Sequence, residues 1–372
     1  MRKRSAREVP VADAGVISRP APRRAVLRMK EYHPPLGGRD VLRLDFNENT
    51  VACSPKVRNV LAQFAACDLT KYPERQVVEA KAALHLGLKP EQVVLTNGVD
   101  EAIHIVCETY MDAGDEMLLP VPTYTMYEVY ASGTDGRAVT VQAGEDFAFP
   151  TERLLAAITP STKIVAIANP NSPTGATVTR EEILAIAARA PGAVVLVDEA
   201  YFHFFGETVA DLIGMVPNLM LARTFSKAYG LAGLRLGLLA GAQENMQWIR
   251  RVLSPYSVNS LALACLLPAL EDETYLRWYV EEVCGARQEF KDGLDALGIR
   301  WWPTQANFVL THIGAKHRDF VAAMHRRGVL VRDRSADPGC DGCVRVTVGT
   351  REQMRQAVGS FRASLEEIHW SK

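Results

Sequence analysis

One lysine stands in a setting that suits covalent chemistry. The stretch from Thr224 to Gly237 reads TFSKAYGLAGLRLG, and Lys227 has small or apolar neighbours in it apart from Ser226 and Arg235. Because burial makes a charged ammonium costly, an apolar pocket favours the neutral, nucleophilic amine. The pattern indicates a Schiff base with an aldehyde. A surface lysine after a strand is the simpler alternative, but it would not require small residues on both sides.

A carboxylate follows another apolar run. Residues 194–197 read VVLV and lead into DEAY, which begins at Asp198 and ends at Tyr201. A carboxylate at the tip of a buried strand requires a positive partner or a hydrogen-bond donor. A protonated pyridine nitrogen would be such a partner, and the pairing would keep the ring an electron sink. Capping of the next helix is the alternative for Asp198 taken alone.

Free backbone N–H groups are expected at a third strand end. The stretch TNGVDE, residues 96–101, follows an apolar run and opens an amphipathic helix. Helix N-termini bind phosphate, and Gly98 lets the backbone come close to a ligand. Ser226 and Arg235 could supply a hydroxyl and a guanidinium to the same phosphate. A simply capped helix explains this stretch equally well.

Two more loops complete the pattern. Tyr124, in PTYTMY, offers a ring on which a flat cofactor could stack, unless it belongs to the core. The loop NPNSPTG offers Asn171 or Ser172 to a phenolic oxygen, although a plain turn also fits its composition. A phosphate site, a stacking ring, a donor, an acid and an amine together match pyridoxal 5'-phosphate.

These side chains are positioned by an α/β unit. Short, continuously apolar runs alternate with amphipathic helices such as 100–111 and 181–190, which predicts strands covered on both faces in a mostly parallel sheet. The runs are 93–95, 117–119, 164–167, 194–197, 219–221 and 236–239. Open sheets of this kind bind ligands at the carboxyl ends of their strands.

After residue 255 the pattern changes to long helical periods and then to a smaller α+β unit. We predict a flexible basic arm over 1–29, an N-terminal part of a small domain over 30–66, a large cofactor-binding domain over 67–267 and the remainder of the small domain over 268–372. An organelle-targeting peptide is the alternative for the Arg-rich arm.

Composition excludes several classes of partner. The 372 residues are 48% hydrophobic, and 42 basic side chains face 43 acidic ones, for a formal charge of −1. This balance gives no general attraction for nucleic acid or an anionic membrane, and no apolar stretch is long enough to span a bilayer. We expect a cytoplasmic protein. Seven cysteines indicate reduced thiols, and the lone C-x-x-C of Cys340 and Cys343 lacks the second pair that zinc prefers, so no metal is expected.

The motifs resemble those of fold-type I, class-II aminotransferases, and most closely histidinol-phosphate aminotransferases, from about residue 29 to 361. The resemblance implies that Lys227 binds the cofactor aldehyde and shuttles a proton. It implies that Asp198 pairs with the pyridine nitrogen, that Tyr201 bonds the phenolate and that Tyr124 stacks on the ring. The residues around the phosphate would be Gly98, Val99, Asp100, Thr224, Ser226 and Arg235.

Further stretches resemble that branch. They are EYHPP with Tyr32 and DFNEN with Asn47, both on the substrate side, and KYPE with Tyr72. In the family the last tyrosine crosses a dimer interface to the partner's cofactor phosphate, so a homodimer is implied. Arg332 and Arg345 resemble its substrate-anion arginines, and two guanidinium forks suit a phosphate monoester or the carboxylates of glutamate. Surface arginines on edge strands are the alternative.

The sequence departs from the family pattern at two positions. Ser172 stands where the family has Asn, and Thr50 stands where the branch has Pro. The bond to the cofactor oxygen could come from Ser172, from Asn171 or through water.

Several rival functions remain. An aromatic amino-acid aminotransferase and a threonine-phosphate decarboxylase share the scaffold. A ligand sensor would require a DNA-binding domain ahead of the fold, and a nicotinamide enzyme a G-x-G-x-x-G after an early strand, which the sequence lacks.

Overall fold

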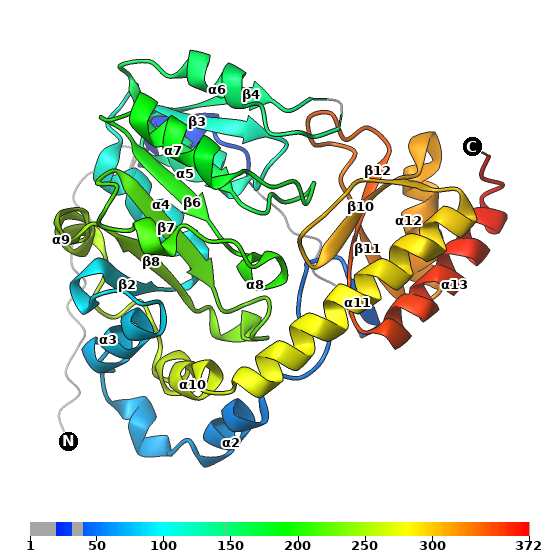
Figure 1. The fold of residues 1–372 in the computed structure, drawn as a ribbon, viewed down its shortest axis with the longest axis horizontal. Helices are drawn as coiled ribbons and strands as arrows, with labels where there is room; N and C mark the ends of the chain where they lie inside the picture. The colour runs from blue at the N-terminus through cyan, green and yellow to red at the C-terminus, as the bar shows by residue number, and fades with distance from the viewer. Residues whose placement is uncertain (1–19, 32–39, 145, 372) are drawn as a thin grey trace, which may run out of the picture.

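The protein is described by a computed structural model that covers residues 20–31, 40–144 and 146–371 (Figure 1). The larger of its two sheets has seven strands in the order β2-β8-β7-β6-β5-β3-β4. Their bounds are β2 Val93–Thr96, β3 Glu116–Val121, β4 Arg137–Gln142, β5 Thr162–Ala168, β6 Val194–Asp198, β7 Leu219–Thr224 and β8 Gly237–Gly241. Every neighbouring pair is parallel except the two that include β8. The predicted, mostly parallel sheet is therefore confirmed.

Helices cover both faces of this sheet. Alternate residues of β6 belong to different core clusters, with Val195 and Val197 on one face and Val194 and Leu196 on the other. Two covered faces explain why the strands are continuously apolar. The helices are α3 Gln76–His85, α4 Gly98–Tyr110, α5 Met126–Gly133, α6 Thr151–Ala157, α7 Arg180–Arg189, α8 Phe202–Phe205, α9 Gln243–Val252 and α10 Ser260–Leu270.

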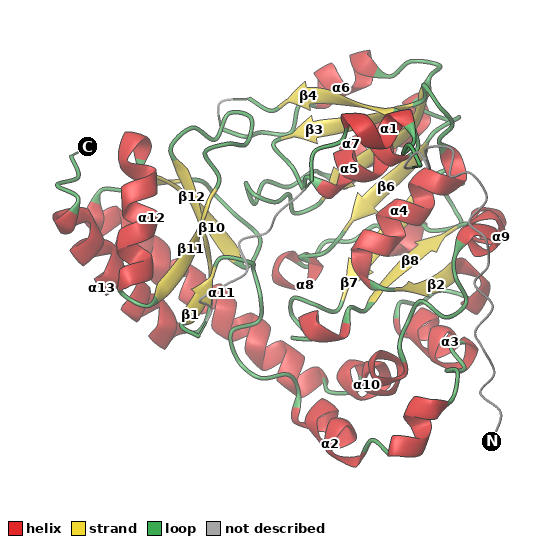
Figure 2. Cartoon of the chain, turned by 180° about the vertical axis from the view of Figure 1, so that it is seen from behind, coloured by secondary structure: helices red, strands yellow, loops and turns green. Residues whose placement is uncertain are grey.

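The smaller sheet has five strands in the order β1-β11-β12-β10-β9. They are β1 Leu42–Leu44, β9 Arg300–Trp301, β10 Phe308–His312, β11 Val329–Asp333 and β12 Cys343–Thr347. β1 pairs with β11 in parallel, so a segment near the N-terminus completes a sheet built from the C-terminal part of the chain. The helices of this part are α11 Glu273–Leu297, α12 His317–Arg326 and α13 Arg351–Glu367, and α13 packs along α11 (Figure 2).

The N-terminal part connects both units. Leu44 lies in the core of the smaller sheet, whereas Val57 of α2 (Pro55–Gln63) lies in that of the larger one. Most of the predicted basic arm lies outside the described residues. Its described end contains a short helix, α1 Arg24–Arg28, where none was expected. Two contacts hold this helix in place: Ala25 is buried, and Arg28 forms an ion pair with Asp135. Within the described ranges, no helix is both long and apolar enough to cross a bilayer.

Candidate active site

Adjacent strands of the larger sheet bring the predicted acid and amine to the same side, at the carboxyl ends of the strands. Asp198 is the last residue of β6 and pairs in register with Ala222 of β7, and Lys227 lies three residues after the end of β7. The Lys227 amine donates to the carbonyl of Phe46, at 2.9 Å, and lies 5.8 Å from the centre of the Tyr201 ring. The Phe46 carbonyl comes from a segment 181 positions away and was not anticipated.

Two donors hold the buried carboxylate of Asp198. The Tyr127 hydroxyl donates to Oδ2, at 2.7 Å, and the backbone N–H of Ala200 donates to Oδ1, at 2.9 Å. Burial raises the pKa of Asp198 to about 6, although both hydrogen bonds act to lower it. Tyr127 was not among the predicted site residues. It lies three positions after Tyr124, on the first turn of α5, and this spacing was the available signal.

Tyr201 lies against the N-terminal segment. Its hydroxyl accepts a hydrogen bond from the side-chain amide of Asn47, at 2.8 Å, and its ring meets Phe308 edge-on. The backbone N–H of Asn47 donates to the hydroxyl of Thr347, at 2.9 Å, and its carbonyl accepts from Asn307, at 3.2 Å. These bonds fix the Asn47 amide beside the Tyr201 hydroxyl. Asn47, predicted on the substrate side, is therefore in direct contact with Tyr201, predicted on the cofactor side.

The start of α4 forms a close-packed backbone cradle. Gly98 has a φ of 77°, and Val99 is buried beside it. A Cβ on Gly237 would lie 2.7 Å from the Gly98 carbonyl carbon and 2.9 Å from the Val99 nitrogen. The buried Ser226 hydroxyl has no hydrogen-bond partner among the described residues, while the Ser226 N–H donates to Thr224. Ser226 lies two residues after Thr224, which pairs with Gly237, and Gly237 packs on Gly98. A buried, unpartnered hydroxyl and the N–H groups of a helix start both suit an anion such as phosphate.

Alanine at Gly98 tests this cradle. Its Cβ would lie 2.9 Å from Nη2 of Arg235, on a backbone that side chains rarely adopt. We expect binding of pyridoxal phosphate to weaken by about 10-fold, as measured by cofactor titration. Gly87→Ala is the matched control, because Gly87 has a φ of 70° but open space around it. Equal loss of cofactor affinity in both variants would mean that backbone strain alone causes the loss, and that the start of α4 is not the phosphate site.

One carboxylate joins the predicted stacking ring to the predicted phosphate arginine. Asp100 accepts a hydrogen bond from the Tyr124 hydroxyl, at 2.7 Å, and another from Nη2 of Arg235, at 2.8 Å. Arg235 is itself in the left-handed region, with a φ of 52°. Asp100 therefore positions two other predicted site residues, Tyr124 and Arg235. Its own backbone N–H lies at the start of α4.

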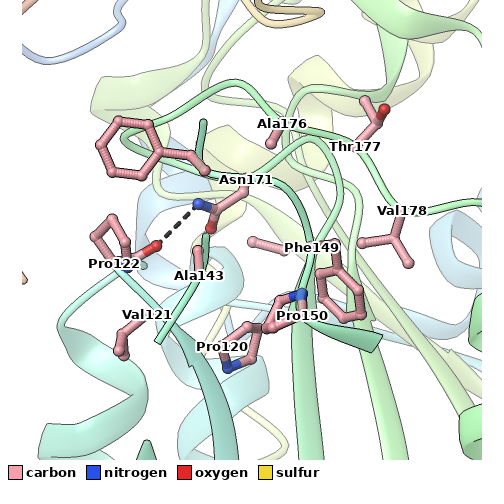
Figure 3. Close-up of a pocket in the computed structure, with 12 residues that line it drawn as sticks. Pro120, Val121, Pro122, Ala143, Phe149, Pro150, Asn171, Ala176, Thr177 and Val178 are labelled. Carbon is pink, nitrogen blue, oxygen red and sulfur yellow. Dashed lines mark hydrogen bonds between the residues drawn. The ribbon is translucent and has the colours of Figure 1, made fainter. Parts of the chain in front are cut away.

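The alternatives left open for the NPNSPTG loop differ in geometry. The Asn171 amide donates to the carbonyl of Pro122 (Figure 3). It also donates to the hydroxyl of Thr174, and its oxygen accepts from Thr123. Its hydrogen-bonding groups are thus engaged in joining two loops. Ser172 is buried, and its oxygen accepts a bond from Nη1 of Arg345, at 3.0 Å. This leaves the Ser172 hydroxyl proton available for another acceptor.

The two predicted substrate arginines face each other across neighbouring strands. Arg332 of β11 and Arg345 of β12 are register partners, so both side chains lie on one face of the sheet. Arg345 also donates to the carbonyl of Asp45, at 2.8 Å, and its Nε has no partner among the described residues. Burial, followed by repulsion from Arg334, lowers the pKa of Arg345. Two neighbouring guanidinium groups, with the Nε donor of Arg345 unpartnered among the described residues, suit an anionic substrate.

The remaining candidates lie apart from this cluster or outside the description. Tyr72 is 78% exposed and lies with its ring 4.6 Å from that of Tyr256. Tyr32 falls outside the described residues. Cys340 and Cys343 are free and buried, and Cys343 is the first residue of β12. Among the described His, Cys, Asp and Glu side chains, no group of three could hold a metal ion.

Known proteins share this sequence and fold. The profile of the family "Aminotransferase class I and II" matches residues 39–361. The histidinol-phosphate aminotransferase of Moorella thermoacetica is 34% identical over 363 residues, covering 93% of each chain. That of a Geobacillus species is 32% identical, covering 91% of this chain and 94% of the relative.

A solved structure extends the likeness to the fold. The crystal structure of histidinol-phosphate aminotransferase from Sinorhizobium meliloti, in complex with pyridoxal-5'-phosphate, has a TM-score of 0.84 at 24% identity and covers 93% of this chain and 97% of its own. The predicted fold-type I architecture is confirmed by this likeness. With the profile match and the two curated relatives, it leads to one conclusion. The chain belongs to the class I and II aminotransferases and is a relative of the histidinol-phosphate aminotransferases.

Proposed function

We propose that this protein is a pyridoxal-phosphate-dependent aminotransferase that interconverts histidinol phosphate and 2-oxoglutarate with imidazole-acetol phosphate and glutamate. The observation that carries the proposal is the arrangement of two neighbouring strands. Asp198 ends β6, Lys227 follows the adjacent β7, and the Lys227 amine lies 5.8 Å from the centre of the Tyr201 ring. The names of the curated relatives support the substrate, and the bound cofactor of the Sinorhizobium meliloti enzyme supports the cofactor. The cytoplasmic location expected from the composition stays a prediction.

The residues present fit the cofactor. Its phosphate would meet the backbone of Gly98 and Val99, the unpartnered hydroxyl of Ser226 and the Arg235 guanidinium. Its ring would lie beside Tyr124, with the nitrogen toward Asp198 and the phenolic oxygen toward Tyr201. When bound, pyridoxal phosphate supplies an aldehyde that reacts with amines and a ring that delocalises negative charge.

The protein's side chains then divide the proton chemistry among themselves. The Lys227 amine would accept a proton from the α-carbon of the amino donor and would return it to the carbon of the cofactor aldehyde, on the other side of the donor nitrogen. The buried carboxylate of Asp198 would face the ring nitrogen and stabilise its proton by opposite charge. In the cofactor-free protein the Phe46 carbonyl holds the Lys227 amine near the Tyr201 ring, where the cofactor aldehyde would meet it. The same groups serve both half-reactions, which predicts ping-pong kinetics.

Substrate choice is tested on one preparation. Turnover of histidinol phosphate, phenylalanine and threonine phosphate is compared under one set of conditions. We expect the highest kcat/KM with histidinol phosphate, because Arg332 and Arg345 form a paired guanidinium site. Undetectable turnover of histidinol phosphate would reject this substrate. Preference for phenylalanine, or release of carbon dioxide from threonine phosphate, would identify the corresponding rival.

Arg345→Gln separates binding from chemistry. The change removes a buried cation that touches Ser172 and the Asp45 carbonyl. We expect kcat/KM for histidinol phosphate to fall about 100-fold, mainly through KM, because a charge-assisted fork to an anion is lost. Arg345→Lys should retain only part of the affinity for histidinol phosphate, since an ammonium lacks the planar fork of a guanidinium. The exposed Arg355→Gln is the control. An unchanged KM would place the anion elsewhere.

We also propose a homodimer in which Tyr72 serves the partner's site. Tyr72 and Tyr256 form an exposed aromatic pair, and Leu69 and Val77 nearby in the chain are exposed as well. Exposed apolar surface of this kind commonly marks an interface.

A mixing experiment tests this arrangement. Lys227→Ala and Tyr72→Ala subunits are each expected to be impaired, and dissociated mixtures should regain about a quarter of wild-type activity. Half of the random dimers would be mixed, and each of these would hold one intact site. Restoration fails if Tyr72 acts within its own chain, and sedimentation measures the dimer itself.

A further inference from the structure

We infer that Tyr127 is the positioning residue that keeps Asp198 aimed at the cofactor ring nitrogen and ionised beside it. The inference rests on the proposed function, because it concerns the same cofactor site. Tyr127 is fully buried on the first turn of α5, between the predicted stacking ring and the predicted acid. It was not anticipated from the sequence, and it touches the carboxylate directly.

The hydrogen bonds of Asp198 leave room for the ring nitrogen. Tyr127 donates to Oδ2, at 2.7 Å, and Ala200 donates to Oδ1, at 2.9 Å. A carboxylate has about four acceptor positions, so each oxygen keeps one for a further donor. The two protein donors fix the plane of the carboxylate from opposite oxygens. Removal of the Tyr127 hydroxyl would leave only the bond to the backbone at Oδ1 to orient Asp198.

The same bond decides the charge of Asp198. Burial raises the pKa of this carboxyl to about 6, and the hydrogen bond from Tyr127 is the largest influence that lowers it. Burial, together with the negative charge of Asp198, raises the pKa of Tyr127 well above its usual value, so the tyrosine stays a proton donor. Without this hydroxyl the pKa of Asp198 would rise toward neutrality. A neutral acid does not stabilise a protonated ring.

One turn of chain links both ends of the cofactor site. The Tyr124 and Tyr127 rings lie 6.0 Å apart at an interplanar angle of 87°, and the Tyr127 N–H donates to the Tyr124 carbonyl, at 3.3 Å. Tyr124 reaches Asp100 at the start of α4, while Tyr127 reaches Asp198 at the end of β6. The beginning of α5 therefore holds the acid in fixed relation to the ring that would stack on the cofactor.

The test compares Tyr127→Phe with Tyr130→Phe. Tyr130 lies on the same helix, is partly buried and stacks on His104, so it controls for loss of a tyrosine hydroxyl from α5. Holoenzyme is prepared with pyridoxal phosphate labelled with ¹⁵N in the ring, and the ¹⁵N chemical shift is followed from about pH 6 to pH 9. The dissociation constant of the cofactor is measured over the same range.

The expected results are specific to Tyr127. In wild type and Tyr130→Phe the ring nitrogen should stay protonated through neutral pH. In Tyr127→Phe the protonated fraction should fall at neutral pH, and cofactor binding should weaken about 10-fold. Incorporation of 3-fluorotyrosine at position 127 keeps the ring and strengthens the donor, so the protonated fraction should be preserved or extended. This second variant keeps the test decisive if Tyr127→Phe folds poorly.

The outcomes separate this inference from the proposed function. If wild type takes up pyridoxal phosphate, and Tyr127→Phe matches it in ¹⁵N titration and cofactor affinity, then Tyr127 is only a core residue and the inference is overturned. If wild type itself takes up no pyridoxal phosphate, the proposed function fails, and Tyr127 has no cofactor to position.

Discussion

Lys227→Ala is expected to remove essentially all transamination, with a fall in rate of at least about 10⁴-fold. The amine is the proposed proton carrier, and it is already held at 2.9 Å from the Phe46 carbonyl and near the Tyr201 ring. The variant should bind pyridoxal phosphate without the visible absorbance that a bond to lysine produces. Steady-state kinetics and absorbance spectra of the purified protein measure both effects.

Lys291→Ala is the matched control for this variant. Lys291 is also partly buried, and burial lowers the pKa of its amine, but it lies over the Trp301 ring in the smaller sheet's unit. We expect the Lys291 variant to keep its activity and its absorbance. Retention of the lysine-bound absorbance by Lys227→Ala would show that another amine binds the cofactor, and the proposed role of Lys227 would be wrong.

The fold could be predicted because burial leaves a strong signature in sequence. Strands such as β5 and β6 are covered on both faces, and their continuous apolar runs gave both their type and their place. The strand β4 was missed because it lies at the edge of the sheet and is mostly exposed or half-buried, so it has no such run. α1 was missed for a related reason, since five residues carry too little periodicity and its position depends on a distant ion pair.

The residues of the site could be predicted only in part from the sequence. The alternation of strands and helices places residues at the carboxyl ends of the strands, but it does not fix the contacts among their side chains. The bonds from Lys227 to Phe46 and from Asn47 to Thr347 join positions 181 and 300 residues apart. No spacing rule predicts them. Likewise, the sequence could not choose between Asn171 and Ser172, which stand side by side. The three-dimensional structure distinguishes them, because Asn171 is engaged by neighbouring loops and Ser172 meets Arg345.

Asp198→Asn should lower activity and raise the stability of the cofactor-free protein at neutral pH. Activity should fall by about 10³-fold or more, because an amide does not stabilise the protonated ring. The exposed Asp211→Asn, which removes only an ion pair with Arg180, is the control for activity. The stability effect has a different origin. Burial raises the pKa of Asp198 from 3.8 to about 6, so folding disfavours the carboxylate.

The sign of this stability effect follows from proton binding. Between about pH 4 and pH 6 the folded state keeps a proton on Asp198 that the unfolded state has lost, so the free energy of unfolding falls as pH rises, by up to about 3 kcal/mol from this group. Asparagine does not titrate. Urea unfolding of both cofactor-free proteins should therefore show the variant gaining on wild type from pH 4 to pH 7.5. A constant difference across that range would mean that Asp198 is not destabilised by burial, and that the site does not depend on the cofactor's positive charge to stabilise the carboxylate.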